Sequence, residues 1–306
     1  MFVRQLSYLV TLAREKHFSR AAEKCNVTQS TLSAGLKALE RELDMRLVIR
    51  EPRFMGLPPE GERVVEWAAQ IIIDYESLKQ DVEGLREGLR GTLRLGVIPA
   101  AMPALARLTA AFCAKHPHVC VDVNSLTSIE IQNGLDKFEI DAALTYLDNE
   151  PLVNVRRRKL YEEKYMFVTS AHGPFAQSET VTWQDAASEN LCLLHEGMQN
   201  RRALNNLACS VGLKLVPTVT TNSFLAVCSY VCSGVWSSII PHTFSYLFAG
   251  CKDLMLIDLI EPVHFQTIGL VTSDRSPLPP LAHALMQCAS SLDFEDQLIP
   301  SGASAG

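Results

Sequence analysis

The sequence predicts a multidomain protein with an N-terminal α-helical head, a long connecting helix and an α/β domain of two lobes. Two short helical runs separated by a turn lie near the start, one apolar rhythm then continues to about residue 89, and strands alternate with helices twice after residue 92. We therefore expect a head at 1–58, a helix at 59–90, a two-lobed domain at 91–300 and a flexible tail at 301–306. The first lobe should comprise about 91–160 and 268–300, and the second about 161–267.

The composition is that of an ordinary globular protein, because 47% of the 306 residues are hydrophobic and 20% are charged. The first twenty residues carry charges throughout, and no stretch contains eighteen uncharged apolar residues, so we expect neither a signal peptide nor a membrane span. These features predict a cytoplasmic protein with no membrane partner. Nine Cys at irregular spacing favour buried reduced thiols over a disulfide framework.

Charge is distributed unevenly along the chain. Residues 1–58 contain ten Lys and Arg against six Asp and Glu, a balance of +4, whereas the remainder contains 18 basic and 28 acidic residues, a balance of −10. A basic head on an acidic body is expected when only the head contacts phosphates. The charge pattern therefore predicts nucleic-acid binding by the head.

The head should contain three helices. Ser19 and Thr28 are favourable N-cap residues, and each precedes a run of strong helix formers, with a break at Asn26-Val27. This pattern predicts a short helix, a tight turn and another helix. The preceding helix is predicted by the apolar residues Leu6, Leu9, Val10 and Ala13.

The helix that follows Thr28 has two different faces. A narrow apolar stripe contains Leu32, Leu36, Leu39 and Leu43, and the opposite side contains Ser30, Ser33, Ala34 and Lys37. Short side chains on the second face would let the helix enter a major groove about 12 Å wide. Gly35 costs this helix roughly 1 kcal/mol relative to Ala. The alternative is an amphipathic helix of an ordinary bundle.

A hairpin and a long helix should complete the N-terminal part. Two short apolar runs at 47–50 and 54–57 flank a turn that contains Pro and Arg, which predicts a small hairpin. From Glu60 to about Leu89, apolar residues are spaced by alternating fours and threes, a heptad rhythm that predicts a coiled coil with a second copy of the chain. The predicted seam residues are Val64, Ala68, Ile71, Tyr75, Leu78, Val82 and Leu85.

The remainder reads as two βαβαβ units, which predict two parallel sheets in two compact lobes. The first unit has strands at 93–98, 119–124 and 141–146 and helices at 103–115 and 128–138; the second has strands at 191–194, 216–221 and 235–240 and helices at 198–211 and 224–232. Strands at 159–169 and 265–272 should connect the lobes, and a helix at 281–292 should close the first lobe.

The head carries three motifs: Phe18-Ser19-x-Ala21-Ala22, Val27-Thr28-Gln29-Ser30-x-Leu32-Ser33 and Leu39-Glu40-x-Glu42-Leu43. They closely resemble the winged helix-turn-helix of LysR-type transcriptional regulators. The two lobes joined by the strands at 159–169 and 265–272 resemble the periplasmic-binding-protein-like effector domain of the same family. The chain departs from the usual pattern at Thr31 and at Ala34-Gly35, so Gln29, Ser30 and Ser33 are the base-contacting positions that carry over.

The resemblance implies a regulator that binds double-stranded DNA as a homodimer or tetramer, with RNA polymerase as a further candidate partner. The implied DNA-binding residues are Thr28, Gln29, Ser30, Thr31, Ser33 and Lys37, with Arg50 and Arg53 at the hairpin, or wing. Arginine at a hairpin tip suits a minor-groove or phosphate contact, whereas a solvated turn is the alternative.

A small-molecule effector should bind where strands of both lobes end and helices begin, because helix N-termini present free N–H groups there. The turns that should converge contribute Pro99, Ala100, Ala101, Met102, Thr127, Ser128, His195, Gly197, Met198, Gln199, Asn200, Asn222 and Ser223. Together with the nearby Arg201, they favour a small anion, above all a carboxylate. For each residue alone, a capped loop is the alternative. No cofactor is expected.

Two groups of residues have the composition of a metal site or a redox centre. Cys113, His116, His118 and Cys120 have the composition of a zinc site, but Cys113 should lie on the buried side of a helix and Cys120 should begin a core strand. Cys228 and Cys232 lie one helical turn apart, yet their apolar surroundings should raise a thiol pKa. We therefore expect no metal site and no redox centre, and the sequence contains no common catalytic motif.

The main alternative is a two-lobed binding protein or enzyme that uses the head only as a docking module. The small side chains on the exposed face of the head favour DNA binding instead. The effector, the operator and the direction of regulation do not follow from the sequence.

Overall fold

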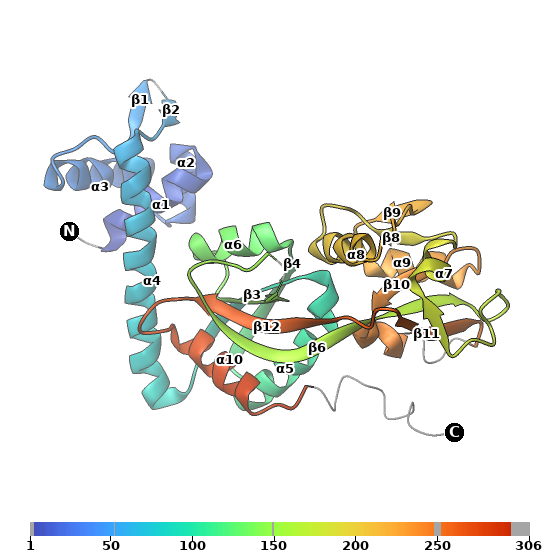
Figure 1. The fold of residues 1–306 in the computed structure, drawn as a ribbon. Helices are drawn as coiled ribbons and strands as arrows, with labels where there is room; N and C mark the ends of the chain where they lie inside the picture. The colour runs from blue at the N-terminus through green and yellow to red at the C-terminus, as the bar shows by residue number, and fades with distance from the viewer. Residues whose placement is uncertain (1–2, 52, 149, 248–251, 295–306) are drawn as a thin grey trace. The chain divides into compact units, whose positions relative to one another are not determined.

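The computed structural model describes residues 3–51, 53–148, 150–247 and 252–294, and it does not describe the side chains at 50–55, 80, 83, 85–87 and 246–247. The predicted tail at 301–306 and the side chains of Arg50, Arg53 and Leu85 lie outside this description. The chain forms two compact units, Met1–Arg90 and Gly91–Gly306 (Figure 1). Within the described ranges, no helix combines the length and hydrophobicity needed to cross a membrane.

Three helices and a hairpin form the head: α1 (Val3–Glu15), α2 (Phe18–Lys24), α3 (Gln29–Glu42), β1 (Ile49–Glu51) and β2 (Arg53–Gly56). Leu32, Leu36 and Leu39 are fully buried against α1 and α2, so the predicted stripe of α3 is the packing face. The side chain of Thr28 caps α3 by accepting a hydrogen bond from the Thr31 amide at 3.2 Å, as predicted.

The prediction for Ser19 was wrong. His17 is the N-cap of α2, without a side-chain cap, and Ser19 lies in the first turn of the helix. The Ser19 hydroxyl instead donates a hydrogen bond to Oε1 of Gln29 at 3.0 Å, between α2 and α3. A residue type that is favourable at an N-cap was therefore used for a tertiary contact.

Close packing of α1 against α3 explains Gly35. A Cβ atom added there would lie 2.8 Å from Cδ2 and 2.9 Å from Cε2 of Tyr8. The Tyr8 side chain is only 5% exposed, so its ring has little room to move away. The absence of a side chain at Gly35 therefore lets the two helices approach closely, and the free energy of this packing offsets the cost of a glycine within a helix.

We expect Gly35→Ala to destabilise the head by on the order of 1 kcal/mol, because overpacking typically costs 1–3 kcal/mol and the gain in helix propensity is about 1 kcal/mol. Urea unfolding followed by circular dichroism would measure the change. Ala34→Gly is the matched control, because Ala34 is exposed and should show only the ordinary cost of glycine. A stabilised Gly35→Ala variant would contradict the packing explanation.

The long helix α4 (Pro59–Glu87) presents an exposed apolar stripe. Its members and their exposed fractions are Trp67 64%, Ile71 37%, Tyr75 47%, Leu78 61% and Val82 50%. Two predicted seam residues face the head instead: Ala68 is 1% exposed within the head core, and Val64 packs against the same core. Ala68 and Val64 were therefore assigned wrongly to the seam, and the neighbouring Trp67 is exposed instead.

The first lobe is built on strands β3 (Gly91–Val97), β4 (Val119–Ser125) and β5 (Ala142–Tyr146), with β3 parallel to both neighbours. Helices α5 (Met102–Lys115), α6 (Ser128–Asp136) and α10 (Pro280–Ser290) belong to this lobe, and the short helix η1 (Pro99–Ala101) precedes α5. Strand β12 (Phe265–Ser273) lies antiparallel to β5 and completes the order β4-β3-β5-β12-β6. Figure 1 shows β12 beside β6. The elements predicted for this lobe are confirmed.

The sheets of the two lobes are joined rather than separate, because β6 (Val155–Ser170) is 16 residues long and contributes to both. Its residues 155–164 pair with β12, and its residues 165–170 pair antiparallel with β10 (Ser238–Pro241) and β11 (Leu254–Ile260). The prediction of two separate parallel sheets was wrong in this respect. The β11 strand was also absent from the prediction.

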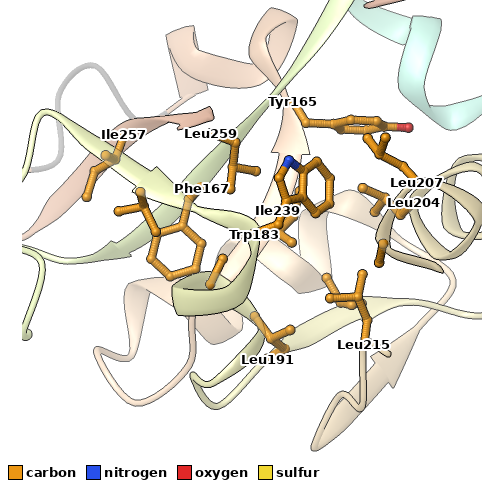
Figure 2. Close-up of a cluster of buried hydrophobic side chains, with 14 residues drawn as sticks. Tyr165, Phe167, Trp183, Leu191, Leu204, Leu207, Leu215, Ile239, Ile257 and Leu259 are labelled. Atoms are coloured by element: carbon orange, nitrogen blue, oxygen red, sulfur yellow. The ribbon is translucent and has the colours of Figure 1, made fainter. Parts of the chain in front are cut away.

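The second lobe surrounds its own core, which Figure 2 shows around Trp183, Phe167 and Tyr165. The Trp183 ring is 1% exposed, and its Nε1 donates to the Pro262 carbonyl at 3.0 Å. The remaining elements of this lobe are β7 (Thr180–Thr182), α7 (Trp183–Ala187), β8 (Cys192–Leu194), α8 (Gln199–Ser210), β9 (Val219–Thr221), α9 (Phe224–Cys232) and η2 (His242–Leu247). The two-lobed α/β architecture is therefore as predicted, whereas β7 and α7 were missed.

Candidate functional site

The N-terminal turn of α3 forms a polar, exposed surface on the head. The side chains of Thr28, Gln29, Ser30, Thr31 and Lys37 are exposed, and Ser33 is half-buried. The Thr28 hydroxyl lies 2.9 Å from the Ser30 hydroxyl and 2.8 Å from the Thr31 hydroxyl, which holds these groups in one cluster. A helix N-terminus with small polar side chains can accept a phosphate closely.

Further cations lie at the other end of α3. An open surface depression there is lined by Lys37, Glu40, Arg41, Asp44, Met45 and Arg46. The Glu40 carboxylate accepts hydrogen bonds from the Leu47 and Val48 amides at 3.0 and 3.1 Å, and so fixes the start of the hairpin. The sequence prediction omitted Arg41 and Arg46, which are exposed cations beside Lys37.

A small pocket lies between the two lobes. Its lining consists of Ile98, Pro99, Ala100, Leu126 and Thr127 from the first lobe and Leu194, Met198, Gln199 and Asn200 from the second. Its free volume of about 10 Å³ is room for one water molecule, so the lobes must move apart to admit a larger molecule. Six of the lining residues were predicted, and the three missed ones are apolar. Among the described residues, the predicted positions Ala101, Met102, Ser128, His195, Gly197, Asn222 and Ser223 lie outside this lining.

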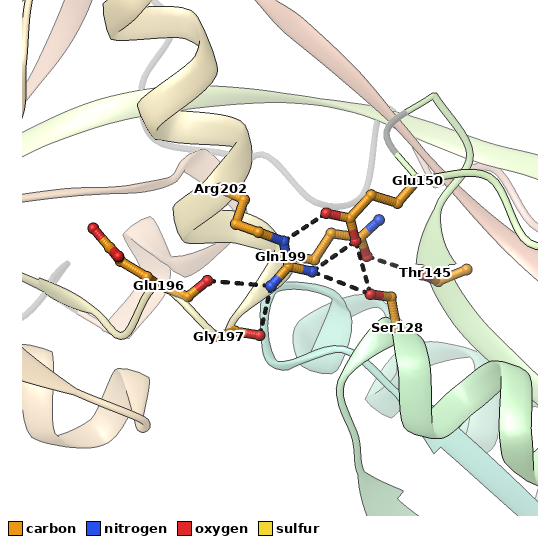
Figure 3. Close-up of polar contacts among 7 residues, drawn as sticks. All are labelled: Ser128, Thr145, Glu150, Glu196, Gly197, Gln199 and Arg202. Atoms are coloured by element: carbon orange, nitrogen blue, oxygen red, sulfur yellow. Dashed lines mark hydrogen bonds and ion pairs between the residues drawn. The ribbon is translucent and has the colours of Figure 1, made fainter.

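An ion pair connects the lobes beside the pocket (Figure 3). The Arg202 guanidinium on α8 donates to both carboxylate oxygens of Glu150, at 2.5 and 2.6 Å, and its Nη1 also contacts the Glu196 and Gly197 carbonyls. Ser128 donates to the same carboxylate at 3.1 Å. The hydrogen bonds from Arg202 hold the pKa of Glu150 below its usual range. We call the Arg202–Glu150 pair the interlobe ion pair.

Neither residue of the interlobe ion pair was predicted, and Arg201 was assigned wrongly to the effector site. The Arg201 side chain is 2% exposed, and its guanidinium donates to the Leu194 and Leu215 carbonyls and to the Asn205 side chain. These bonds hold segments of the second lobe together, so Arg201 does not present its charge to the pocket. The motif Arg201-Arg202 alone does not tell which arginine points toward the other lobe.

A buried polar cluster lies behind the pocket. The Tyr146 hydroxyl on β5 donates to Oε1 of Glu163 on β6 at 2.6 Å, and Nδ2 of Asn200 on α8 donates to the Tyr146 hydroxyl at 2.9 Å. Glu163 is 1% exposed, and burial raises the pKa of its carboxyl to about 8. Oε2 of Glu163 and Oδ1 of Asn200 have no hydrogen-bond partner among the described residues.

The cysteine and histidine groups show no arrangement suited to metal binding within the described residues. Cys120 is exposed on β4 rather than part of a core, so that reason for discounting a zinc site was wrong. Cys228 is buried, and burial raises the pKa of its thiol to about 11, as its apolar surroundings predicted. None of the residues that line the pocket is a cysteine.

Comparison with known protein families covers both units. Residues 3–62 match the bacterial regulatory helix-turn-helix proteins of the lysR family, and residues 86–292 match the LysR substrate binding domain. Over 281 residues the chain is 26% identical to the DNA-binding transcriptional dual regulator OxyR of Escherichia coli K12, with 91% of each protein covered. Over 280 residues it is 30% identical to the HTH-type transcriptional regulator EstR of Acinetobacter baylyi, covering 90% of this chain and 92% of EstR.

Solved structures share the fold. A full-length OxyR variant from Pseudomonas aeruginosa gives a TM-score of 0.75 at 24% identity, with 97% of both chains covered. Full-length CbnR complexed with its target DNA gives a TM-score of 0.65 at 18% identity, covering 95% of this chain and 99% of that chain. At these identities the likeness concerns the fold alone.

Proposed function

Because this chain belongs to the LysR family of bacterial transcriptional regulators, we propose that a small molecule in the interlobe pocket controls how α3 engages a specific DNA sequence. The family consists of DNA-binding regulators with an effector-binding domain, not of enzymes. The observation that carries the proposal for this chain is the exposed, hydroxyl-rich N-terminal turn of α3 on a head of net charge +4. We place its action in the cytoplasm, where it would meet DNA and RNA polymerase.

The effector is proposed to be a small carboxylate with an apolar body. Ile98, Leu126 and Leu194 would contact the apolar part. Helix α8 begins beside the pocket at Met198 without a side-chain cap, so the N–H groups of its first turn can donate to an anion. Arg202 is paired with Glu150, so these N–H groups, rather than an arginine, would provide the positive potential.

Homo-oligomer formation is part of the proposal. Ile71, Tyr75, Leu78 and Val82 on α4 have the spacing of a coiled-coil seam, and Trp67 extends the exposed stripe by one turn. A second copy of α4 would bury this stripe. The two heads of such a dimer would bind two half-sites. We propose a dimer as the minimal unit and a tetramer as the assembled form.

Several relatives are named hydrogen peroxide-inducible genes activators. We propose that this chain responds to a bound molecule rather than to thiol oxidation at the pocket. Two observations support this view: the residues that line the pocket include no cysteine, and burial raises the pKa of the Cys228 thiol. A high thiol pKa leaves little of the reactive thiolate near neutral pH.

Ser30→Glu tests the DNA-binding surface. The substitution puts a carboxylate where phosphates should lie, and two like charges 4 Å apart repel by about 1–4 kcal/mol, so affinity for DNA selected by the wild-type protein should fall at least tenfold. Stability should not fall, because an acidic residue in the first turn interacts favourably with the helix dipole. Fluorescence anisotropy would measure the loss. Ser30→Gln is the control of matched shape, and equal losses in both variants would contradict a charge effect.

Thr127→Asp tests the charge of the effector. Thr127 caps α6 and forms a capping box in which Glu130 accepts from the Thr127 amide and hydroxyl at 2.8 and 2.9 Å. Aspartate keeps the cap but lies beside the Glu130 carboxylate, so stability should change by less than about 1 kcal/mol. Binding of butyrate and benzoate, measured by calorimetry, should be lost. Thr127→Asn, a neutral cap, should retain it; equal binding by all three proteins would remove the anion proposal.

A further inference from the structure

Asn200 connects the pocket to the buried polar cluster. Asn200 is one of the residues that line the pocket, and its Nδ2 is 2.9 Å from the Tyr146 hydroxyl and 3.4 Å from the Tyr165 hydroxyl. The residue is 5% exposed, and its Oδ1 has no partner among the described residues. A buried amide oxygen without a hydrogen bond costs about 1–3 kcal/mol, so this site favours a change that gives it a partner.

The bonding of Asn200 depends on the proton of Glu163. When Glu163 is ionised, it can only accept, so the Tyr146 hydroxyl donates to it and in turn accepts from the Asn200 amide. The Asn200 oxygen is then left without a hydrogen-bond partner. When Glu163 is neutral, its own O–H can donate to Tyr146, whose hydroxyl is then free to donate to the Asn200 oxygen. Rotation of the Asn200 amide by 180° would satisfy this bond and put its NH₂ group where the unpaired oxygen now lies.

We propose that the chain Glu163–Tyr146–Asn200 sets the hydrogen-bonding character of the pocket, so that the pocket accepts a small carboxylate only together with a proton on Glu163. The inference rests on the proposed function of the pocket and adds a specificity determinant to it. When Glu163 is neutral, the Asn200 NH₂ group is available to donate to an anion. When Glu163 is ionised, the Asn200 oxygen takes that position and repels the anion. Glu163 and Tyr146 are therefore positioning residues that act through Asn200.

The surroundings of Glu163 suit a carboxyl that holds its proton. The titratable groups that face it are Tyr146 from β5 and Tyr161 and Tyr165 from β6, and its cross-strand neighbour on β12 is the neutral Gln266. No ion pair involves Glu163 among the described side chains; the adjacent Lys164 pairs with Asp258 at 2.7 Å. Burial without a cation raises the carboxyl pKa, as found.

Titration calorimetry of the full chain with butyrate and benzoate between pH 6.5 and 9 tests the inference. Wild-type affinity should fall by about tenfold per pH unit above pH 8, the slope of one linked proton. Glu163→Gln should bind with nearly constant affinity, because its amide can donate to Tyr146 at every pH. Tyr146→Phe, which interrupts the chain, should also lose the pH dependence. Benzamide, which is uncharged, should bind wild type equally across the range.

The possible results distinguish failure of the proton-linked chain from failure of the proposed carboxylate binding. If the carboxylates bind but wild type and Glu163→Gln share one pH profile, the proton-linked chain is wrong and the pocket proposal stands. If neither carboxylate binds at any pH while DNA binding is intact, the carboxylate class is wrong. In that case infrared difference spectra of wild type minus Glu163→Gln at pH 7 test the protonation of Glu163 by itself: an ionised carboxyl overturns the proton-linked chain, and a protonated one leaves that chain in place for a ligand of another class.

Discussion

Leu78→Asp should convert the proposed dimer to monomers and weaken binding to a two-half-site DNA by about 10²–10⁴-fold. Leu78 is 61% exposed in the single chain and lies in the middle of the apolar stripe on α4. Burying an unpaired carboxylate in a helix–helix seam costs several kcal/mol, which is comparable to the free energy of a modest interface. Loss of the second head removes the gain in affinity that comes from linking two binding sites.

Light scattering would report the mass, and fluorescence anisotropy with DNA selected by the wild-type protein would report affinity. Glu76→Lys is the matched control, because Glu76 is exposed on the opposite side of the same turn and its replacement also changes the charge of α4. The control should retain its mass. A Leu78→Asp protein of unchanged mass would show that the stripe serves another contact.

Glu163→Gln should stabilise the two-lobed unit increasingly as pH rises. The folded-state pKa of Glu163 is about 8, against 4.5 for an ordinary Glu, so folding retains a proton that the unfolded chain releases. A raised carboxyl pKa means that stability is highest below pH 4.5 and declines until about pH 8, where the folded state also loses the proton. The difference in pKa corresponds to on the order of 5 kcal/mol, which a neutral glutamine does not lose.

Differential scanning calorimetry at several pH values from 5 to 8.5 would measure this effect. The melting temperatures of wild type and Glu163→Gln should be similar near pH 5 and diverge toward pH 8. Glu162→Gln is a close control, because Glu162 is its neighbour in β6 but forms an exposed pair with Lys159. Exposed pairs contribute at most about 1 kcal/mol, so its profile should follow wild type. Parallel profiles for all three proteins would show that Glu163 is ionised in the fold.

The sequence predicted the head and the first lobe because their signals are local. The Leu32, Leu36 and Leu39 stripe, the Thr28 cap and the heptad spacing of α4 each depend on residues within a few turns of one another. The turns that meet at the pocket were also predictable, because parallel strands bring successive helix N-termini to one edge of a sheet. Six of the nine residues that line the pocket follow from this rule.

Contacts between distant segments were decided only by the tertiary structure. Helical periodicity placed Ala68 in the stripe of α4 but could not tell that the head covers it, and residue type made Ser19 a cap when its partner was Gln29. Arg201 and Arg202 are adjacent and chemically identical, yet one is buried within a lobe and the other reaches Glu150 of the other lobe beside the pocket. Burial among β5, β6, β12 and α8 raises the pKa of Glu163, and only the tertiary structure creates this burial. The periodicity of a sequence shows which face of a helix or strand is apolar. The residues that this face contacts come from distant parts of the chain, so only the tertiary structure determines them.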